Sequence, residues 1–210
     1  MTVHLHEGDL PADVRFAPGP IAVDTETMGL HPHRDRLCLV QLSDGQGDEH
    51  LVRFAPDASG HVDYSAPRLK ALLSDRARLK LYHFARFDLA VLEHHLGIEA
   101  GPVFCTKIAS KLTRTYTDRH GLKDLLRELL GVEVSKQQQS SDWGADTLSE
   151  AQKDYAASDV RYLHRAHEIL VQRLARENRT AIADACFAFL PTRARLDLAG
   201  WAESDIFAHM

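Results

Sequence analysis

Three segments near the N-terminus have the length and pattern of β-strands, and they constrain the fold more than any other feature of the chain. They are residues 21–24, 37–43 and 49–54, which are continuously apolar or alternate apolar with polar side chains. Turn residues lie between them, such as Asp44-Gly45-Gln46-Gly47 between the second and the third. Strands joined by short turns pair antiparallel, so we expect three antiparallel strands at the start of the fold.

Helical patterns dominate the rest of the chain. The predicted helices are residues 66–73, 86–96, 105–112, 122–130 and 149–177. A short buried strand is expected at residues 79–82, and Thr147 or Ser149 is expected to cap the last helix, with Glu150 nearby. Strands followed by helices predict an α/β fold, a mixed sheet flanked by helices. No linker or repeat interrupts the 210 residues, so we expect a single domain over residues 1–210.

An acidic motif follows the first apolar run, where Asp24-Thr25-Glu26 comes directly after Ile21-Ala22-Val23. Residues i and i+2 of a strand share a face, so Asp24 and Glu26 should project to the same side where the strand ends. Two adjacent carboxylates repel each other. Oxygen ligands at this spacing suit Mg²⁺ or Mn²⁺, which would remove the repulsion and let a substrate phosphate complete the shell.

Two further blocks carry acidic residues. His83-Phe84-Ala85-Arg86-Phe87-Asp88 follows the second buried run, and Tyr155-Ala156-Ala157-Ser158-Asp159 lies in the last predicted helix. Tyr155 and Asp159 are four positions apart and therefore share a helix face. We expect Tyr155 to orient or help to deprotonate an attacking water.

Taken together, the three blocks predict a site for metal-dependent phosphodiester hydrolysis. Two metal ions roughly 3.5–4 Å apart can hold the attacking and leaving oxygens of an in-line displacement. The predicted ligands are Asp24, Glu26, Asp88 and Asp159. Each block alone is ambiguous, because Asp-x-Glu is usually a solvated strand end and Tyr-x-x-x-Asp an ordinary helix surface. Their common order, each on an element that would aim it correctly, favours one site.

With these blocks in this order, the chain resembles the DEDD 3′-to-5′ exonucleases, in the subgroup that carries tyrosine in the third motif. Further stretches resemble the nanoRNase C group of this family. They are Thr106–Lys111, Thr113–Lys123, Ser135–Trp143 and Gly200–His209. The resemblance covers nearly the whole chain. It implies a ribonuclease H-like fold, two Mg²⁺ or Mn²⁺ ions per site, and 3′–5′ exoribonuclease activity on dinucleotides.

The resemblance also implies substrate contacts. In related enzymes a leucine shortly after Asp-x-Glu wedges between two bases, and Leu30 holds that position; the alternative is a loop leucine that caps the core. Lys136 and Gln138 lie on the loop before the last catalytic helix, where a lysine could pair with a phosphate; a solvated loop is the alternative. Thr25 is placed with these contacts, and so is His83, although many relatives carry asparagine at the latter position.

The charge of the chain argues against a protein that coats long nucleic acid. The net charge is −5 and the pI about 6.2, whereas nonspecific affinity comes mostly from Lys and Arg on phosphates. Residues 107–127 are the basic exception, either as a surface that faces substrate or as a solvated helix face. The expected partner is therefore short RNA, with DNA as an alternative.

Other sequence features bear on location and assembly. The cysteines Cys38, Cys105 and Cys186 form no paired motif, and no signal peptide or membrane-spanning run is found, so we expect a cytoplasmic protein. The tail, about residues 191–210, contains Trp201, Ile206 and Phe207 and is more apolar than a free terminus. It is expected either to pack on its own chain or to make subunit contacts. The resemblance implies a ring-like homo-oligomer, an octamer.

The function predicted from the sequence is thus hydrolysis of very short RNA to 5′-mononucleotides. One rival is the same chemistry on longer structured RNA or on DNA, as in ribonuclease D or proofreading domains. The other is a binding module without catalysis, although clustered carboxylates would repel phosphates in such a protein.

Overall fold

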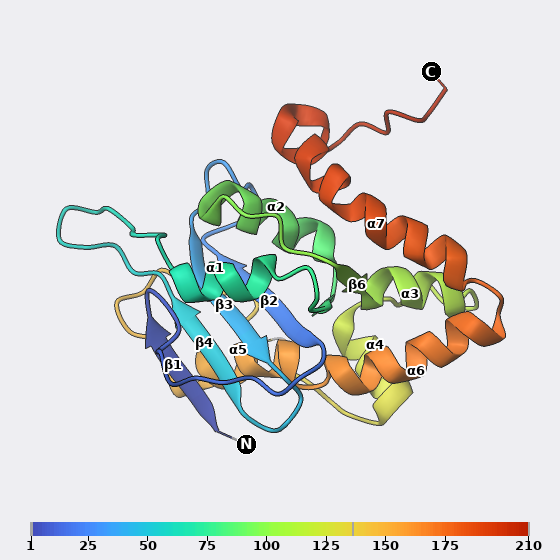
Figure 1. Cartoon of the computed structure of the whole chain (residues 1–210), viewed down its shortest axis with the longest axis horizontal. Helices are drawn as coiled ribbons and strands as arrows, with labels where there is room; N and C mark the ends of the chain where they lie inside the picture. The colour runs from blue at the N-terminus through green and yellow to red at the C-terminus, as the bar shows by residue number, and fades with distance from the viewer. Residues whose placement is uncertain (1, 136, 210) are drawn as a thin grey trace.

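A six-stranded mixed sheet forms the centre of the structure, a computed structural model that describes residues 2–135 and 137–209. The strands are β1 (Val3–Glu7), β2 (Ile21–Thr27), β3 (Leu37–Ser43), β4 (Glu49–Arg53), β5 (Lys80–Tyr82) and β6 (Val103–Cys105). Their order across the sheet is β1-β4-β3-β2-β5-β6 (Figure 1). The predicted antiparallel trio β2, β3 and β4 is confirmed, as is the strand at β5.

Parts of the sheet differ from the prediction. β1 and β6 were not predicted; β1 pairs parallel to β4, and β6 pairs parallel to β5, which itself runs parallel to β2. Parallel pairs join segments that are distant in the chain, so local sequence patterns do not report them. The strand predicted for residues 21–24 continues to Thr27, because the backbone of Asp24-Thr25-Glu26 pairs with β3. The acidic motif therefore lies within β2 and not at its end.

The helices agree with the prediction in most places. They are α1 (Pro67–Ser74), α2 (Ala85–Leu96), α3 (Thr106–Thr113), α4 (Leu122–Leu130), α5 (Glu150–Arg161), α6 (Leu163–Arg176), α7 (Thr180–Leu196) and the π-helical turn η1 (Asp197–Trp201). Ser149 caps α5, with Gln152 completing a capping box. The single helix predicted for residues 149–177 is wrong, because it breaks at Tyr162 into α5 and α6. α7 was not predicted, and Pro191 lies inside it.

Helices cover both faces of the sheet (Figure 1). α1 and α2 lie on the face toward the viewer, and α5 lies behind the sheet against β2, β3 and β4. The break at Tyr162 follows from this packing, since α5 packs on the sheet while α6 packs on α3 and α4. No helix in the described part of the chain is both long enough and apolar enough to cross a membrane.

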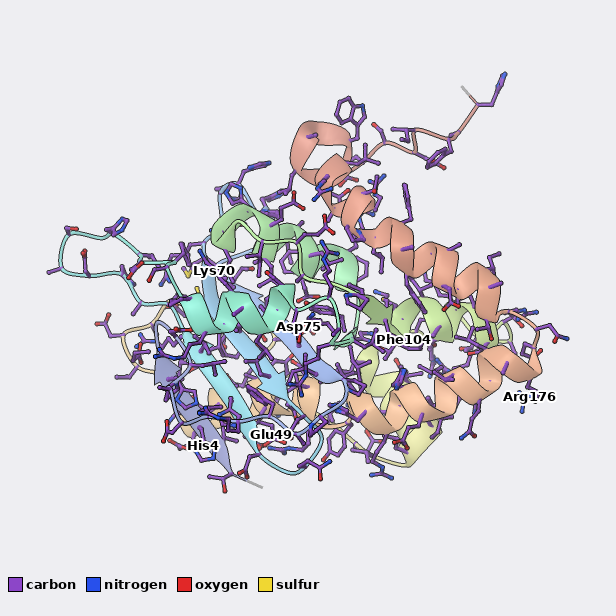
Figure 2. The ribbon with its side chains drawn as sticks, in the orientation of Figure 1. His4, Glu49, Lys70, Asp75, Phe104 and Arg176 are labelled. Atoms are coloured by element: carbon purple, nitrogen blue, oxygen red, sulfur yellow. The ribbon has the colours of Figure 1, made fainter. Side chains whose placement is uncertain are left out.

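Two sets of contacts join helices to the sheet, and the strand residues involved, Glu49 and Phe104, are labelled in Figure 2. Glu49, almost fully buried at the start of β4, accepts a hydrogen bond from Arg161 Nε of α5 at 2.9 Å. The ring of Phe104 on β6 packs against His167 of α6 and Phe187 of α7, at centroid distances of 4.5 and 4.7 Å. The contact between Arg161 and Glu49 joins α5, which carries the third acidic block, to β4.

Candidate active site

Three of the predicted ligands converge where α5 crosses β2. One carboxylate oxygen from each of Asp24, Glu26 and Asp159 lies within 4.8 Å of the others. Asp24 and Glu26 share a face of β2 by strand periodicity, and α5 brings Asp159 to that same face. The structure therefore brings these three predicted ligands together.

The fourth carboxylate, Asp88, comes from α2 and is only 3% exposed. Thr25, between the two acidic residues of β2, points the other way and donates a hydrogen bond from Oγ1 to Asp88 Oδ1 at 2.8 Å. The buried Thr25 hydroxyl thus positions a carboxylate. Its predicted substrate contact stays a prediction, and the side chain is already engaged.

The pKa values of all four carboxyl groups are raised. Burial is the main cause at every one of them, and it raises the pKa of Asp88 and of Asp159 to about 7. The pKa values of Asp24 and Glu26 lie well above their ordinary range, because burial is reinforced by the neighbouring acidic side chains. Such a set of hard oxygen donors fits a divalent cation, whose charge would replace the protons and remove the repulsion.

Tyr155 lies one helical turn before Asp159 and hydrogen-bonds to its carboxylate. Burial, followed by the charge of Asp159, raises the pKa of the phenol well above its usual range. Tyr155 is therefore a neutral phenol, suited to hydrogen-bond a water. Trp143, almost fully buried, packs beside it at a ring-centroid distance of 6.0 Å.

Two buried polar residues beside the site were missed from the sequence. Gln41 is paired with Asp24 across β2 and β3, and its Nε2 donates to Asp24 Oδ2 at 3.3 Å. Tyr82 on β5 is fully buried, and its hydroxyl has no hydrogen-bond partner among the described residues. Burial, reinforced by the charges of Asp88 and Asp24, raises its pKa well above the usual range. A glutamine inside the otherwise apolar run Leu37–Leu42 was the available signal for the first of them.

The acidic residues line a cleft of about 730 Å³. Its other walls include apolar, aromatic and basic side chains: Met28, Leu30, His83, Phe84, Phe87, Leu122, Val134, Trp143, Lys107 and Lys123. Leu30 is 79% exposed, which excludes the alternative that it caps the core. His83 Nδ1 lies 2.9 Å from Thr106 Oγ1, beside the cleft.

The loop before α5 carries the two predicted substrate contacts Lys136 and Gln138. Lys136 lies outside the described residues. Gln138 does not line the cleft formed by the described residues, whereas its neighbours Gln139, Ser140 and Ser141 do. The predicted substrate contact of Gln138 stays a prediction, with those three residues as nearer candidates.

Some basic residues of the segment 107–127 face the cleft, and others form ion pairs elsewhere. Lys107 and Lys123 line the cleft. Arg114 is instead buried, with Nε donating to Glu128 at 3.0 Å, and Arg127 Nη2 donates to Asp124 at 2.6 Å.

The C-terminal residues are joined to α2 through Asp197. Arg86, two positions before Asp88, donates from Nε to Asp197 Oδ2 at 2.5 Å, and Arg193 Nη2 lies 2.8 Å from Oδ1. Beyond this junction Trp201, Ile206 and Phe207 are exposed.

Comparisons with known proteins indicate the family of this chain. A family model described as 3′-5′ exonuclease matches residues 9–175. The curated relatives include ribonuclease D of Gluconacetobacter diazotrophicus, 36% identical over 76% of this chain and 39% of that protein. The chain thus spans about two fifths of the length of such relatives.

Solved structures resemble the whole chain. NrnC of Brucella melitensis bound to pGG is 58% identical, with a TM-score of 0.94 and complete coverage of both chains. The same protein with bound Mg²⁺ is 57% identical, with a TM-score of 0.92 and complete coverage. The ribonuclease H-like fold implied by the resemblance is confirmed. With a matching family model over most of its length and four carboxylates in place, the chain belongs to the 3′–5′ exonuclease family.

Proposed function

We propose that the chain is a divalent-metal-dependent 3′–5′ exoribonuclease that hydrolyses very short RNA, down to dinucleotides, to 5′-mononucleotides. The observation that carries this proposal is the convergence of Asp24, Glu26 and Asp159 within 4.8 Å, on the wall of a cleft that also presents an exposed leucine. The cleft volume of about 730 Å³ suits a small ligand, since such sites typically measure roughly 300–1,000 Å³. The likeness to NrnC bound to pGG over the full chain supports the same substrate class.

Asp24, Glu26, Asp88 and Asp159 would hold two ions, Mg²⁺ or Mn²⁺. When bound, these ions would polarise the scissile phosphate and lower the pKa of the attacking water. The NrnC structure with bound Mg²⁺ supports this cofactor.

Side chains of the protein orient the attacking water, the carboxylates and the bases of the substrate. The Tyr155 hydroxyl donates a hydrogen bond to the Asp159 carboxylate, which leaves the phenol oxygen free to accept a hydrogen bond from the attacking water. Thr25 and Gln41 fix two of the carboxylates by hydrogen bonds. Leu30 would separate the two bases of a dinucleotide.

The proposal includes one domain that assembles into a homo-oligomer in the cytoplasm, an octamer as the resemblance implies. The exposed Trp201, Ile206 and Phe207 support subunit contacts through the tail. Light scattering after size-exclusion chromatography measures the mass directly.

A second candidate is hydrolysis of longer structured RNA or of DNA. The matches to ribonuclease D and to DNA polymerase I of Aquifex aeolicus, 32% identical over 93% of this chain and 34% of that protein, favour it. Turnover of 5′-labelled RNAs of two to ten nucleotides, and of DNAs of equal lengths, separates the two candidates. Catalytic efficiency that rises with length would overturn the dinucleotide proposal, and no turnover on any RNA would overturn the exoribonuclease proposal.

A further inference from the structure

Phe84 has an unusual backbone for an aromatic residue. It lies between β5 and α2 with φ 70° and ψ 43°, in the left-handed region. Among the described non-glycine residues only Ala66, Asn178 and Phe84 have positive φ. A bulky side chain is disfavoured in this conformation, and such residues cluster at functional sites.

The side chain of Phe84 is presented to the cleft. It lines the cleft and is 44% exposed, whereas the nearby Asp88 is only 3% exposed. Met28 and Leu30, the other large exposed apolar side chains of the same cleft, belong to the segment that follows Asp-Thr-Glu. The cleft therefore has apolar surface on two separate segments of the chain.

Lys107 lies over the ring of Phe84. Its Nζ is 4.1 Å from the ring centroid, a cation–π contact, and it forms no ion pair within the described part of the chain. Lys107 also lines the cleft. An ammonium group beside an aromatic ring, both facing the same space, matches a ligand that joins a flat ring to a phosphate.

Thr106 fixes this pair in place. Its hydroxyl donates to Tyr82 O at 3.1 Å and lies 2.9 Å from His83 Nδ1. It thus ties the start of α3, where Lys107 lies, to the two residues that precede Phe84. The hydrogen bonds of Thr106 therefore join the segment that carries Phe84 to the helix that carries Lys107.

We propose that Phe84 and Lys107 form a platform on which one nucleobase of the substrate stacks, with the lysine ammonium contacting a substrate phosphate. This inference rests on the proposed function, because it places a short RNA in the cleft. The face of the ring that Lys107 does not cover receives the base. Stacking of this kind is tolerant of sequence but stronger for the larger purines.

The test compares Phe84→Leu, which keeps the apolar bulk and removes the aromatic face, with Phe84→Tyr, which keeps the face. Phe16→Leu is the matched control, since Phe16 packs on His50 and does not line the cleft. Binding of pGG and pUU is measured by calorimetry with Mg²⁺ in a Tyr155→Phe background, and kcat and KM are measured with Tyr155 intact. The mass of the assembly in solution is measured by light scattering for every variant.

We expect Phe84→Leu to weaken pGG binding by about 5- to 150-fold, and pUU binding by less. Phe84→Tyr and Phe16→Leu should stay within about twofold of the parent. Lys107→Met should weaken binding of both ligands, with a loss that shrinks as salt rises, whereas Lys107→Arg should restore it.

Two results would overturn the platform. One is equal pGG affinity of Phe84→Leu and the parent while wild type still hydrolyses pGG, which leaves the proposed function standing. The other is a fall in the solution mass of the assembly for Phe84→Leu with unchanged pGG affinity per subunit, which would make Phe84 a subunit contact. A wild type that neither binds nor hydrolyses pGG would overturn the proposed function together with the platform.

Discussion

Replacing Asp88 by asparagine should stabilise the metal-free protein, and more at pH 8 than at pH 5. Asp88 is buried, and its pKa rises from an ordinary 3.8 to about 7 because burial disfavours the charge. Between pH 3.8 and about pH 7, Asp88 therefore keeps a proton in the folded protein that it has released in the unfolded chain. The stability associated with this proton is complete below about pH 4 and is lost as the pH rises to about 7.

The size of the effect follows from the same pKa. One pH unit of separation corresponds to about 1.4 kcal/mol, so the rise at Asp88 amounts to about 4 kcal/mol in total. Of this, about 3 kcal/mol falls between pH 5 and pH 8. Part of this free energy belongs to the other carboxyl groups, whose titration is coupled to that of Asp88. From pH 5 to pH 8 we therefore expect the free energy of unfolding of the variant to increase by about 2–3 kcal/mol relative to that of wild type. Asparagine Oδ1 can still accept the hydrogen bond of Thr25, so packing is preserved.

Urea unfolding of both proteins in EDTA, at pH 5 and pH 8, measures this difference. Mg²⁺ should reverse the order at pH 8, because only wild type keeps the full ligand set. If the free energies of unfolding of wild type and variant differ by the same amount at both pH values, the buried-charge argument is refuted.

Four further predictions concern activity and assembly. Asp24→Ala should abolish hydrolysis without unfolding the protein, since it removes a metal ligand and relieves repulsion; near wild-type turnover in Mg²⁺ would contradict the ligand role, and EDTA should mimic the variant. Tyr155→Phe should lower kcat by roughly 10²–10⁴-fold with little change in affinity, because only the hydroxyl that orients the water is lost; a change confined to KM argues against that role. Leu30→Ala should weaken dinucleotide affinity by roughly 1–3 kcal/mol in calorimetry, and an unchanged Kd would remove the wedge. Deletion of residues 200–210 should lower the mass in light scattering and loosen the preference for two over seven nucleotides; a folded truncated protein that keeps both would contradict the proposed subunit contact.

The sequence predicted the parts of the fold and site that depend on local periodicity. The three antiparallel strands, and the common face of Asp24 and Glu26, follow from the spacing of residues along single elements. That Asp159 joins them was predicted from the order of the three acidic blocks. The break at Tyr162 was missed because residues on both sides of it favour helix, and only the different packing partners of α5 and α6 require the bend.

Other features depend on contacts between distant segments. β6 has three residues and is defined by its parallel partner, so its own sequence carries almost no pattern. A proline disfavours the interior of a helix, yet α7 continues through Pro191 while packed on α2. The backbone of Phe84 was also out of reach, because no local motif predicts a positive φ at an aromatic residue.

The hydrogen bond between Thr25 and Asp88 has a consequence for folding. Its partners are 63 positions apart, and Asp159 joins the same site from still further along the chain. Closing such long loops costs chain entropy before any contact rewards it, so these contacts should form late and together. Partly folded chains that lack either α2 or α5 would contain the catalytic residues without the site. Nuclease activity is thus tied to completion of the whole fold, and its recovery during refolding should lag behind the formation of helix.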